Sequence, residues 1–277
     1  MKKILFPIDF SEASDNAFIY ALEMAKLFKS KLVLLHTFDL PIVESEAMPL
    51  NYATIYDDLQ MANFEHFRDE IQKLRALMQE RNLEHIVMNH ILMDGDLIYN
   101  IKKVIQQENI DFVIMGTNGV KNWFDSFLGT NAGAVISDVA VPVLSIPVES
   151  KFQKVQTIAF TTRFRKKDIE ALVKVLLFAR KMDAQVKCLY VKTAASDVTD
   201  ETIKRWQSHF EDEKRLQFFI IPNENVKETI EDFLLGQDID LLAILTYKRN
   251  FFVELFTTTT TQHLSYYLKT PILALHE

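Results

Sequence analysis

The 277-residue chain has a single cysteine and only six glycines. One cysteine excludes an intramolecular disulfide, and such sparing use of cysteine suits a reducing compartment, so we expect a cytoplasmic protein. Cys188 lies in the apolar segment QVKCLYV, where we expect an inert thiol of the hydrophobic core.

Long hydrophobic runs and an excess of positive charge are also missing. No segment approaches the roughly 18 apolar residues of a membrane-spanning helix. The first apolar run, MKKILFPIDF, is broken by Pro7 and Asp9, so it is too short for a signal peptide. The formal net charge is −7, and no basic face is visible in the sequence. We therefore expect binding to neither membranes nor nucleic acid.

The chain resembles itself at two fixed offsets. KKILFPIDFS near the start matches VQTIAFTTRFR at an offset of 154, and SKLVLLHT matches AQVKCLYV at the same offset. Further on, NIDFVIM matches DIDLLAI at an offset of 129, as Pro142 matches Pro271. The difference between the offsets means that the second copy lacks 25 residues. We interpret the chain as a tandem duplication, with domains at 1–149 and 152–277.

Each copy alternates short runs rich in β-branched residues with longer amphipathic segments. This alternation predicts parallel strands joined by right-handed crossovers, hence two tandem Rossmann-like α/β domains with open parallel five-stranded sheets. In the first copy the expected strands are Ile4–Ile8, Leu32–Thr37, His85–Leu92, Phe112–Met115 and Val143–Ile146.

Helices are predicted between these strands. Ala17, Ala21, Met24 and Phe28 recur at helical spacing, with Ser11 placed as the N-cap. Residues 39–58 are polar and carry prolines, which predicts a surface loop leading into a helix that ends near Asn82. A loop of that length is either a lid or contact arm, or a linker.

Half of the glycines lie within fourteen residues, at Gly116, Gly119 and Gly129. Gly116 follows the expected strand DFVIM, at the sheet edge where open α/β folds bind ligands. Gly129 and Thr130 precede an apolar helical pattern, and a helix N-terminus attracts anions. The spacing matches neither G-x-x-x-x-G-K-[ST] nor G-x-G-x-x-G. A phosphate site and simple turn glycines followed by a helix cap both fit.

The spacing G-x₂-G-x₉-G-T resembles the nucleotide-binding motif of the universal stress protein family. ILFPIDFSEAS and LVLLHTFD also resemble that family's first two strands, DGDLIYNIKK its third helix and VPVLSIP its last strand. The resemblance covers the first copy almost end to end and the second copy more faintly. It implies a Rossmann-like parallel sheet that binds ATP, with or without Mg²⁺.

The resemblance also implies the residues of an adenine-nucleotide site. Asp9, at the end of the first strand, would accept the ribose hydroxyls, and the glycines would surround the phosphates. The full set of implied binding residues is Pro7, Ile8, Asp9, Thr37, Met115, Gly116, Gly119, Gly129, Thr130 and Asn131.

The second copy departs from this pattern. At the two offsets Asp9 becomes Arg163, Gly116 becomes Leu245 and Gly119 becomes Lys248. Side chains at the glycine positions would fill space that a nucleotide needs, so we expect one nucleotide site, in the first copy, and a structural second copy. The alternative is a different anion site formed by Arg163 and Lys248.

Catalytic patterns are weak. The chain has neither an H-E-x-x-H pair nor a G-x-S-x-G elbow. His36 fits a packed strand-end residue better than a general base. Asp94 and Asp96 fit helix-start carboxylates better than Mg²⁺ ligands.

Three functions remain open: a non-catalytic ATP-binding protein of the stress response, a slow ATP hydrolase, and a nucleotide-free protein-interaction module. The last strands of the two copies, VPVLSIP and TPILALH, resemble the family's dimerising strand. We therefore expect the copies to pair as an intrachain pseudo-dimer, with further homodimerisation left open.

Overall fold

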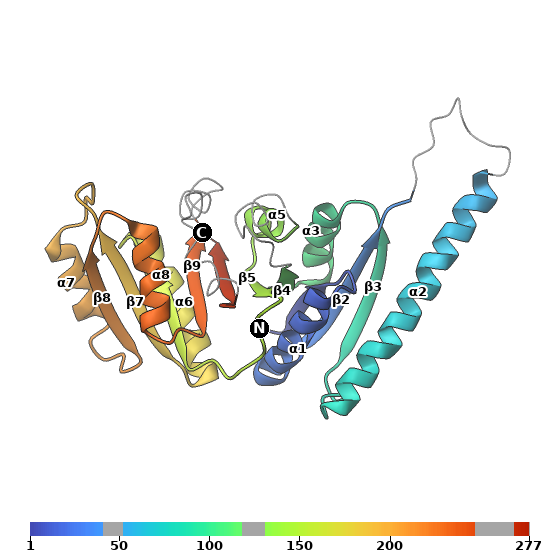
Figure 1. The fold of residues 1–277 in the computed structure, drawn as a ribbon, viewed down its shortest axis with the longest axis horizontal. Helices are drawn as coiled ribbons and strands as arrows, with labels where there is room; N and C mark the ends of the chain where they lie inside the picture. The colour runs from blue at the N-terminus through green and yellow to red at the C-terminus, as the bar shows by residue number, and fades with distance from the viewer. Residues whose placement is uncertain (41–51, 118–130, 247–268, 277) are drawn as a thin grey trace.

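Strands and helices alternate along the chain, which confirms the expected α/β class. The computed structural model describes residues 1–40, 52–117, 131–246 and 269–276 (Figure 1). The elements of the first half are β1 (Lys3–Pro7), α1 (Glu12–Phe28), β2 (Lys31–Phe38), α2 (Tyr52–Glu80), β3 (Met88–Asp94), α3 (Leu97–Glu108), β4 (Phe112–Thr117), α5 (Asn131–Asp138) and β5 (Val143–Pro147). Those of the second half are β6 (Thr157–Thr161), α6 (Lys166–Met182), β7 (Gln185–Lys192), α7 (Asp200–His209), β8 (Leu216–Pro222), α8 (Val226–Gly236), β9 (Leu241–Thr246) and β10 (Ile272–His276).

The described strands form one sheet in the order β3-β2-β1-β4-β5-β10-β9-β6-β7-β8. Pairing is parallel within each half. The halves meet at β5 and β10, which pair antiparallel with Ser145 opposite Ile272. The sheet is therefore continuous from one half into the other, as Figure 1 shows.

Helices cover both faces of this sheet, and the strand sequences explain why. Strand side chains point alternately to the two faces, so a strand buried on both faces is apolar almost throughout. In β1, Ile4 and Phe6 contribute to the core under α1, α2, α6 and α7, whereas Leu5 contributes to the core under α3, α5 and α8. In β2, Leu34 and Leu35 divide between the two cores in the same way.

The strand registers repeat between the halves at the offsets seen in the sequence. Lys3 pairs with Lys31 in the first half, and Thr157 pairs with Gln185 in the second, both at an offset of 154. β4 and β9 are related by 129, since Gly116 lies opposite Ile146 and Leu245 opposite Leu275.

A polar contact repeats at the same offsets. Asp111 Oδ2 accepts hydrogen bonds from the backbone N–H groups of Lys2 and Lys3, at 2.6 and 3.0 Å. Asp240 Oδ2 accepts from the equivalent groups of Gln156 and Thr157, at 2.8 and 2.9 Å. Each carboxylate thus joins the start of the half's first strand to the segment before its fourth.

Three boundaries differ from the expectations. The strand expected at His85–Leu92 starts at Met88, because the chain from Leu83 makes a turn in which Ile86 N–H donates to the Leu83 carbonyl at 3.1 Å. The loop expected to run to about residue 58 is shorter, since α2 already begins at Tyr52. Gly116 lies inside β4 rather than after it.

Two expectations about helix starts are confirmed. Ser11 caps α1, because its side chain accepts a hydrogen bond from Ser14 N–H. Asp96 caps α3 by accepting from Tyr99 N–H at 2.7 Å. Among the helices in the described part of the chain, none is both long and apolar enough to span a bilayer.

Candidate functional site

The carboxyl edge of the first half brings together the described residues of the expected site. Pro7 ends β1, and Ile8 and Asp9 follow it. Thr37 lies near the end of β2, and Gly116 near the end of β4. Because β1 pairs parallel with both β2 and β4, these strand ends share one edge. The chain leaves β1 toward β2 and reaches β4 on the other side, so this edge is a topological switch point.

The other expected residues are placed differently. Gly119, Gly129 and Thr130 lie outside the described residues. Asn131 is the first residue of α5 and is exposed. Met115 is 5% exposed and belongs to the core beneath α3 and α5, so its side chain packs inside the protein.

Asp9 has the polar contacts of a prepared binding group. Its Oδ1 accepts hydrogen bonds from Ser11 N–H at 3.1 Å, from the Ser11 hydroxyl at 2.6 Å, and from the Ser14 hydroxyl. Burial raises the pKa of Asp9, but the hydrogen bonds from Ser11 and Ser14 outweigh it and hold the pKa below its usual 3.8. Within the described chain Oδ2 accepts no hydrogen bond, and the residue is exposed. An ionised carboxylate with one fixed and one available oxygen results.

The backbone next to Asp9 is also fixed. Ile8 N–H donates to the Leu35 carbonyl at 2.9 Å, and the Ile8 carbonyl lies 2.7 Å from His36 Nδ1. Phe10 has a φ of 59°, a strained value for a bulky residue, and its ring lies 4.8 Å from that of His36. His36 is therefore a packed strand-end histidine that orients the loop, as expected.

Gly116 is required by the protein's own packing. A Cβ atom on Gly116 would lie 2.5 Å from the Ala13 carbonyl oxygen and 2.7 Å from its carbon. Real Cβ atoms do not approach that closely, so a glycine lets the first turn of α1 rest directly on β4. This contact places Ser14, and hence Asp9, relative to the end of β4. From its spacing we expect Gly116 to make room for a ligand, whereas in the structure it makes room for the backbone of Ala13.

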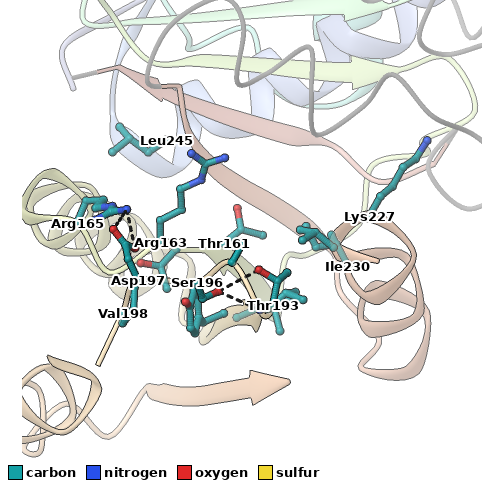
Figure 2. Close-up of a pocket in the computed structure, with 16 residues that line it drawn as sticks. Thr161, Arg163, Arg165, Thr193, Ser196, Asp197, Val198, Lys227, Ile230 and Leu245 are labelled. Carbon is teal, nitrogen blue, oxygen red and sulfur yellow. Dashed lines mark hydrogen bonds and ion pairs between the residues drawn. The ribbon is translucent and has the colours of Figure 1, made fainter. Parts of the chain in front are cut away.

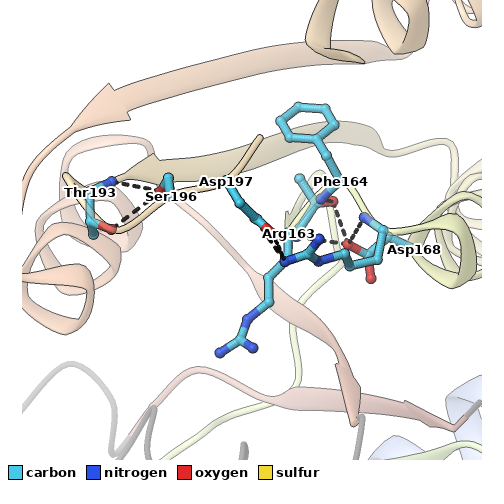
Figure 3. Close-up of polar contacts among 8 residues, drawn as sticks. Arg163, Phe164, Asp168, Thr193, Ser196 and Asp197 are labelled. Atoms are coloured by element: carbon cyan, nitrogen blue, oxygen red, sulfur yellow. Dashed lines mark hydrogen bonds and ion pairs between the residues drawn. The ribbon is translucent and has the colours of Figure 1, made fainter. Parts of the chain in front are cut away.

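The second half replaces this arrangement with a buried carboxylate. Asp168, which occupies the position of Ser14, is 1% exposed. Its Oδ2 accepts hydrogen bonds from Thr162 Oγ1 at 2.9 Å, Arg163 N–H at 2.7 Å and Arg165 N–H at 3.1 Å (Figure 3). The first half has its carboxylate in the loop at Asp9, whereas the second half has it on helix α6 at Asp168. The Arg163 side chain points away from this network. Sequence reasoning missed Asp168, although the offset of 154 places it opposite Ser14.

Two buried groups in this half have perturbed pKa values. Burial raises the pKa of Asp168 above 3.8, more than the backbone hydrogen bonds from Arg165 and Arg163 lower it. Cys188 is buried, and burial raises its pKa well above 9.0. Cys188 therefore belongs to the hydrophobic core, as expected. Within the described residues, no group of three or more His, Cys, Asp or Glu could hold a metal ion.

Parallel strands with helices on both faces and a polar switch-point edge define a Rossmann-like α/β protein. The universal stress protein family model matches residues 1–147, more than half of the chain. The chain therefore belongs to the universal stress protein family, as the sequence resemblance indicated.

Individual relatives agree with this assignment. Universal stress protein MJ0577 of Methanocaldococcus jannaschii is 26% identical over 156 residues, which cover 52% of this chain and 94% of that protein. The chain also resembles the crystal structure of a universal stress protein from Archaeoglobus fulgidus, with a TM-score of 0.72, 17% identity and coverage of 99% of this chain and 96% of that one.

A second solved structure spans the whole chain as well. It is the crystal structure of a protein from Pseudomonas aeruginosa that is described as a universal stress protein. It aligns with a TM-score of 0.61 and 15% identity, over 100% of this chain and 93% of that one. At such identities the two structures show the fold alone, and they show it across both halves.

Proposed function

We propose that the first half binds ATP at its carboxyl edge, as a non-catalytic nucleotide-binding protein of the stress response in the cytoplasm. The observation that carries the proposal is the Asp9 carboxylate. Hydrogen bonds hold its pKa low, Ser11 and Ser14 hold its Oδ1, and its Oδ2 accepts no hydrogen bond within the described chain. A ribose offers two hydroxyl donors, which such an oxygen accepts.

The surrounding residues fit the rest of an adenosine. The Ile8 carbonyl and the backbone groups of Thr37 lie at the same edge as Asp9, at the ends of the neighbouring strands β1 and β2. They would meet the adenine, whose ring edge needs backbone donors and acceptors. The phosphates would bind Gly119, Gly129, Thr130 and the N-terminus of α5 at Asn131, where the helix dipole favours negative charge. Mg²⁺ would arrive with the phosphates and neutralise part of their charge.

We propose that the halves are two domains, 1–149 and 152–277, that pair within the chain as a pseudo-dimer. The antiparallel pairing of β5 with β10 supports this, because it joins the last strands of the two halves. Aromatic contact supports it too: Phe178 of α6 stacks on Phe28 of α1, with ring centroids 5.1 Å apart. A homodimer of whole chains would then use a further surface.

Isothermal titration calorimetry of the full chain with ATP and Mg²⁺ tests the site. Asp9→Asn is the informative variant, because an amide oxygen can still accept from Ser11 and Ser14 while the charge and the second acceptor are lost. We expect binding at one site per chain, at least tenfold weaker in the variant, since hydrogen bonds to charged groups contribute about 1.5–3 kcal/mol.

Asp232→Asn is the matched control, because Asp232 is an exposed carboxylate on α8 in the other half. Equal affinity in wild type and Asp9→Asn would refute the assignment of the site. ADP that accumulates faster with wild type than with Asp9→Asn would instead favour the slow hydrolase. Absence of ATP binding to the wild-type chain would favour the interaction module.

A further inference from the structure

A cavity of about 340 Å³, the seam cavity, lies where the two halves meet. Its lining comes from α1 and β5 of the first half, from the end of α6 and the start of β9 in the second half, and from the segment that joins the halves. The apolar side chains that carry the argument are Met24, Leu27, Leu144, Phe152, Met182 and Leu241. A cavity of about 150 Å³ holds one benzene ring, so this one has room for two rings.

The joining segment, residues 148–156, connects β5 with β6 and forms one wall of the seam cavity (Figure 1). It is held against α1 by Tyr20, whose hydroxyl donates to the Lys151 carbonyl at 2.9 Å. The ring of Phe152 lies edge-on to the ring of Tyr20, with centroids 5.0 Å apart. The wall is therefore fixed, and the hydroxyl of Tyr20 already has a partner within the chain.

The other polar side chains of the lining add little that would bind a polar ligand. The Glu23 carboxylate lies 3.7 Å from Lys26 Nζ, and Gln153 Nε2 donates to Asp240 Oδ1 at 3.0 Å. Lys154 is exposed, so solvent screens its charge. The lining thus favours a ligand that brings neither charge nor many hydrogen-bonding groups.

The apolar side chains favour an aromatic ligand. Leu27 and Phe152 are 41% and 38% exposed, so a ligand that covers them removes apolar surface from water. Met24 and Met182 are buried, and their flexible thioethers adapt to a ligand's shape and make favourable contacts with aromatic rings. The ring of Phe152 adds a further aromatic contact.

The second half has a cavity of a different kind at the carboxyl edge of its own strands. Its volume is about 390 Å³, and Arg163, Arg165 and Asp197 line it together with the start of α8 (Figure 2). Two of these charged groups pair, since one Arg165 nitrogen lies 2.8 and 2.9 Å from the two oxygens of Asp197. Lys248, the expected partner of Arg163 in an alternative anion site, lies outside the described residues. That alternative stays a prediction, and the apolar seam cavity defines its ligand more clearly.

We propose that the seam cavity binds a small neutral aromatic molecule of about two rings, with Phe152, Met24 and Met182 as its main contacts. Both halves line the cavity, so the bound molecule stabilises their pairing. The proposal is independent of ATP binding, because none of the described residues of the proposed ATP site lines the seam cavity.

Fluorescence titration of the full chain with two matched probes tests the proposal. Phenylnaphthylamine is neutral, and anilinonaphthalenesulfonate has the same rings with an added sulfonate. We expect one phenylnaphthylamine per chain, bound about tenfold more tightly than the sulfonate, because a buried charge without a partner is costly. Absence of phenylnaphthylamine binding, or binding of the sulfonate as tight as that of the neutral probe, would overturn the proposal.

Phe152→Ala locates the bound probe. It should weaken phenylnaphthylamine about tenfold, because apolar area and an aromatic contact are lost together. Phe64→Ala is the matched control, since Phe64 is 53% exposed on α2 and outside the cavity. Weaker binding in Phe64→Ala alone would place the probe on α2 and overturn the proposal.

Leu27→Gln provides a second test that keeps the size of the side chain and leaves Phe152 in place. It should also weaken the neutral probe, because the cavity rim then carries an amide that must lose water. Leu235→Gln is its control, since Leu235 is 38% exposed on α8, outside the cavity. Circular dichroism melting verifies that each variant folds. Wild-type affinity in both Phe152→Ala and Leu27→Gln would refute the site.

Two further measurements separate the seam cavity from the ATP site. Saturating phenylnaphthylamine should raise the Tm of the wild-type chain more than that of Phe152→Ala, because a ligand of the folded state stabilises it in proportion to its affinity. An excess of ATP should leave the probe bound. Displacement of the probe by ATP would place it in the first-half site and overturn the proposal, whatever the affinity for ATP.

Discussion

Replacing Gly116 by alanine tests how the first half is assembled. The added Cβ would lie 2.5 Å from the Ala13 carbonyl oxygen, whereas ordinary contacts begin at 3.4 Å. Backbone cannot rotate away as a side chain does, so the first turn of α1 must move by about 1 Å. Phe18 and Leu22 of that helix are fully buried, so the movement disturbs the core.

Overpacking of this kind costs about 1–3 kcal/mol. Each kcal/mol lowers the Tm of a domain of this size by roughly 2–4 °C, so a loss of roughly 2–12 °C is expected. ATP affinity should fall as well, because Ser11 and Ser14 move with the helix and carry the Asp9 carboxylate.

Differential scanning calorimetry measures the change, with Gly236→Ala as the control. Gly236 ends α8, has no atom within 4 Å of an added Cβ, and has no positive φ, so alanine there should leave the Tm unchanged or raise it slightly. A Gly116→Ala protein as stable as wild type would refute the close contact between α1 and β4.

Three further predictions concern stability. Asp168→Asn should keep the hydrogen bonds and remove a buried charge. The pKa of Asp168 is higher in the folded chain than the 3.8 of the unfolded chain. Its contribution to the free energy of unfolding is therefore complete below pH 3.8 and is lost as the pH rises through the pKa of the folded state. Denaturant unfolding across pH 4–8 should therefore show a flatter profile for the variant, and a steeper one would contradict the raised pKa. Asp240→Ala should cost about 1–3 kcal/mol in the same assay, because two backbone N–H groups lose their acceptor; an unchanged midpoint would show that water replaces it. Ser145→Lys should destabilise the chain by several kcal/mol, because Ser145 of β5 is 2% exposed where β5 pairs with β10. Ser137→Lys should not, because Ser137 of α5 is exposed. X-ray scattering that shows separated halves only in Ser145→Lys would agree with this, and equal Tm values for the two variants would contradict it.

Local patterns in the sequence predicted much of the fold. The apolar strands are read from their composition, because parallel strands are buried on both faces. Ser11 as a cap follows from a hydroxyl placed just before a helical pattern. The paired offsets predicted equivalent strands, whose registers agree. The start of β3 was less predictable, since Ile86 is apolar and buried, as in a strand, yet lies in a turn before Met88.

The site was harder to predict because it depends on contacts between distant segments. Nothing local to Gly116 indicates that the Ala13 carbonyl lies against it. The offset of 154 places Ser14 opposite Asp168, but only the structure shows that the two side chains do equivalent work: Ser14 accepts from Asp9 N–H, and Asp168 accepts from Arg163 N–H. The cavity beside Arg163 depends on α8, which the spacing of the motifs does not place.

The most direct test of the central claim is native mass spectrometry of the full chain with ATP and Mg²⁺. We predict one bound nucleotide per chain in wild type, and far lower occupancy in Asp9→Asn. No bound nucleotide in wild type would contradict ATP binding in the first half, and two per chain would contradict the assignment of a single nucleotide site.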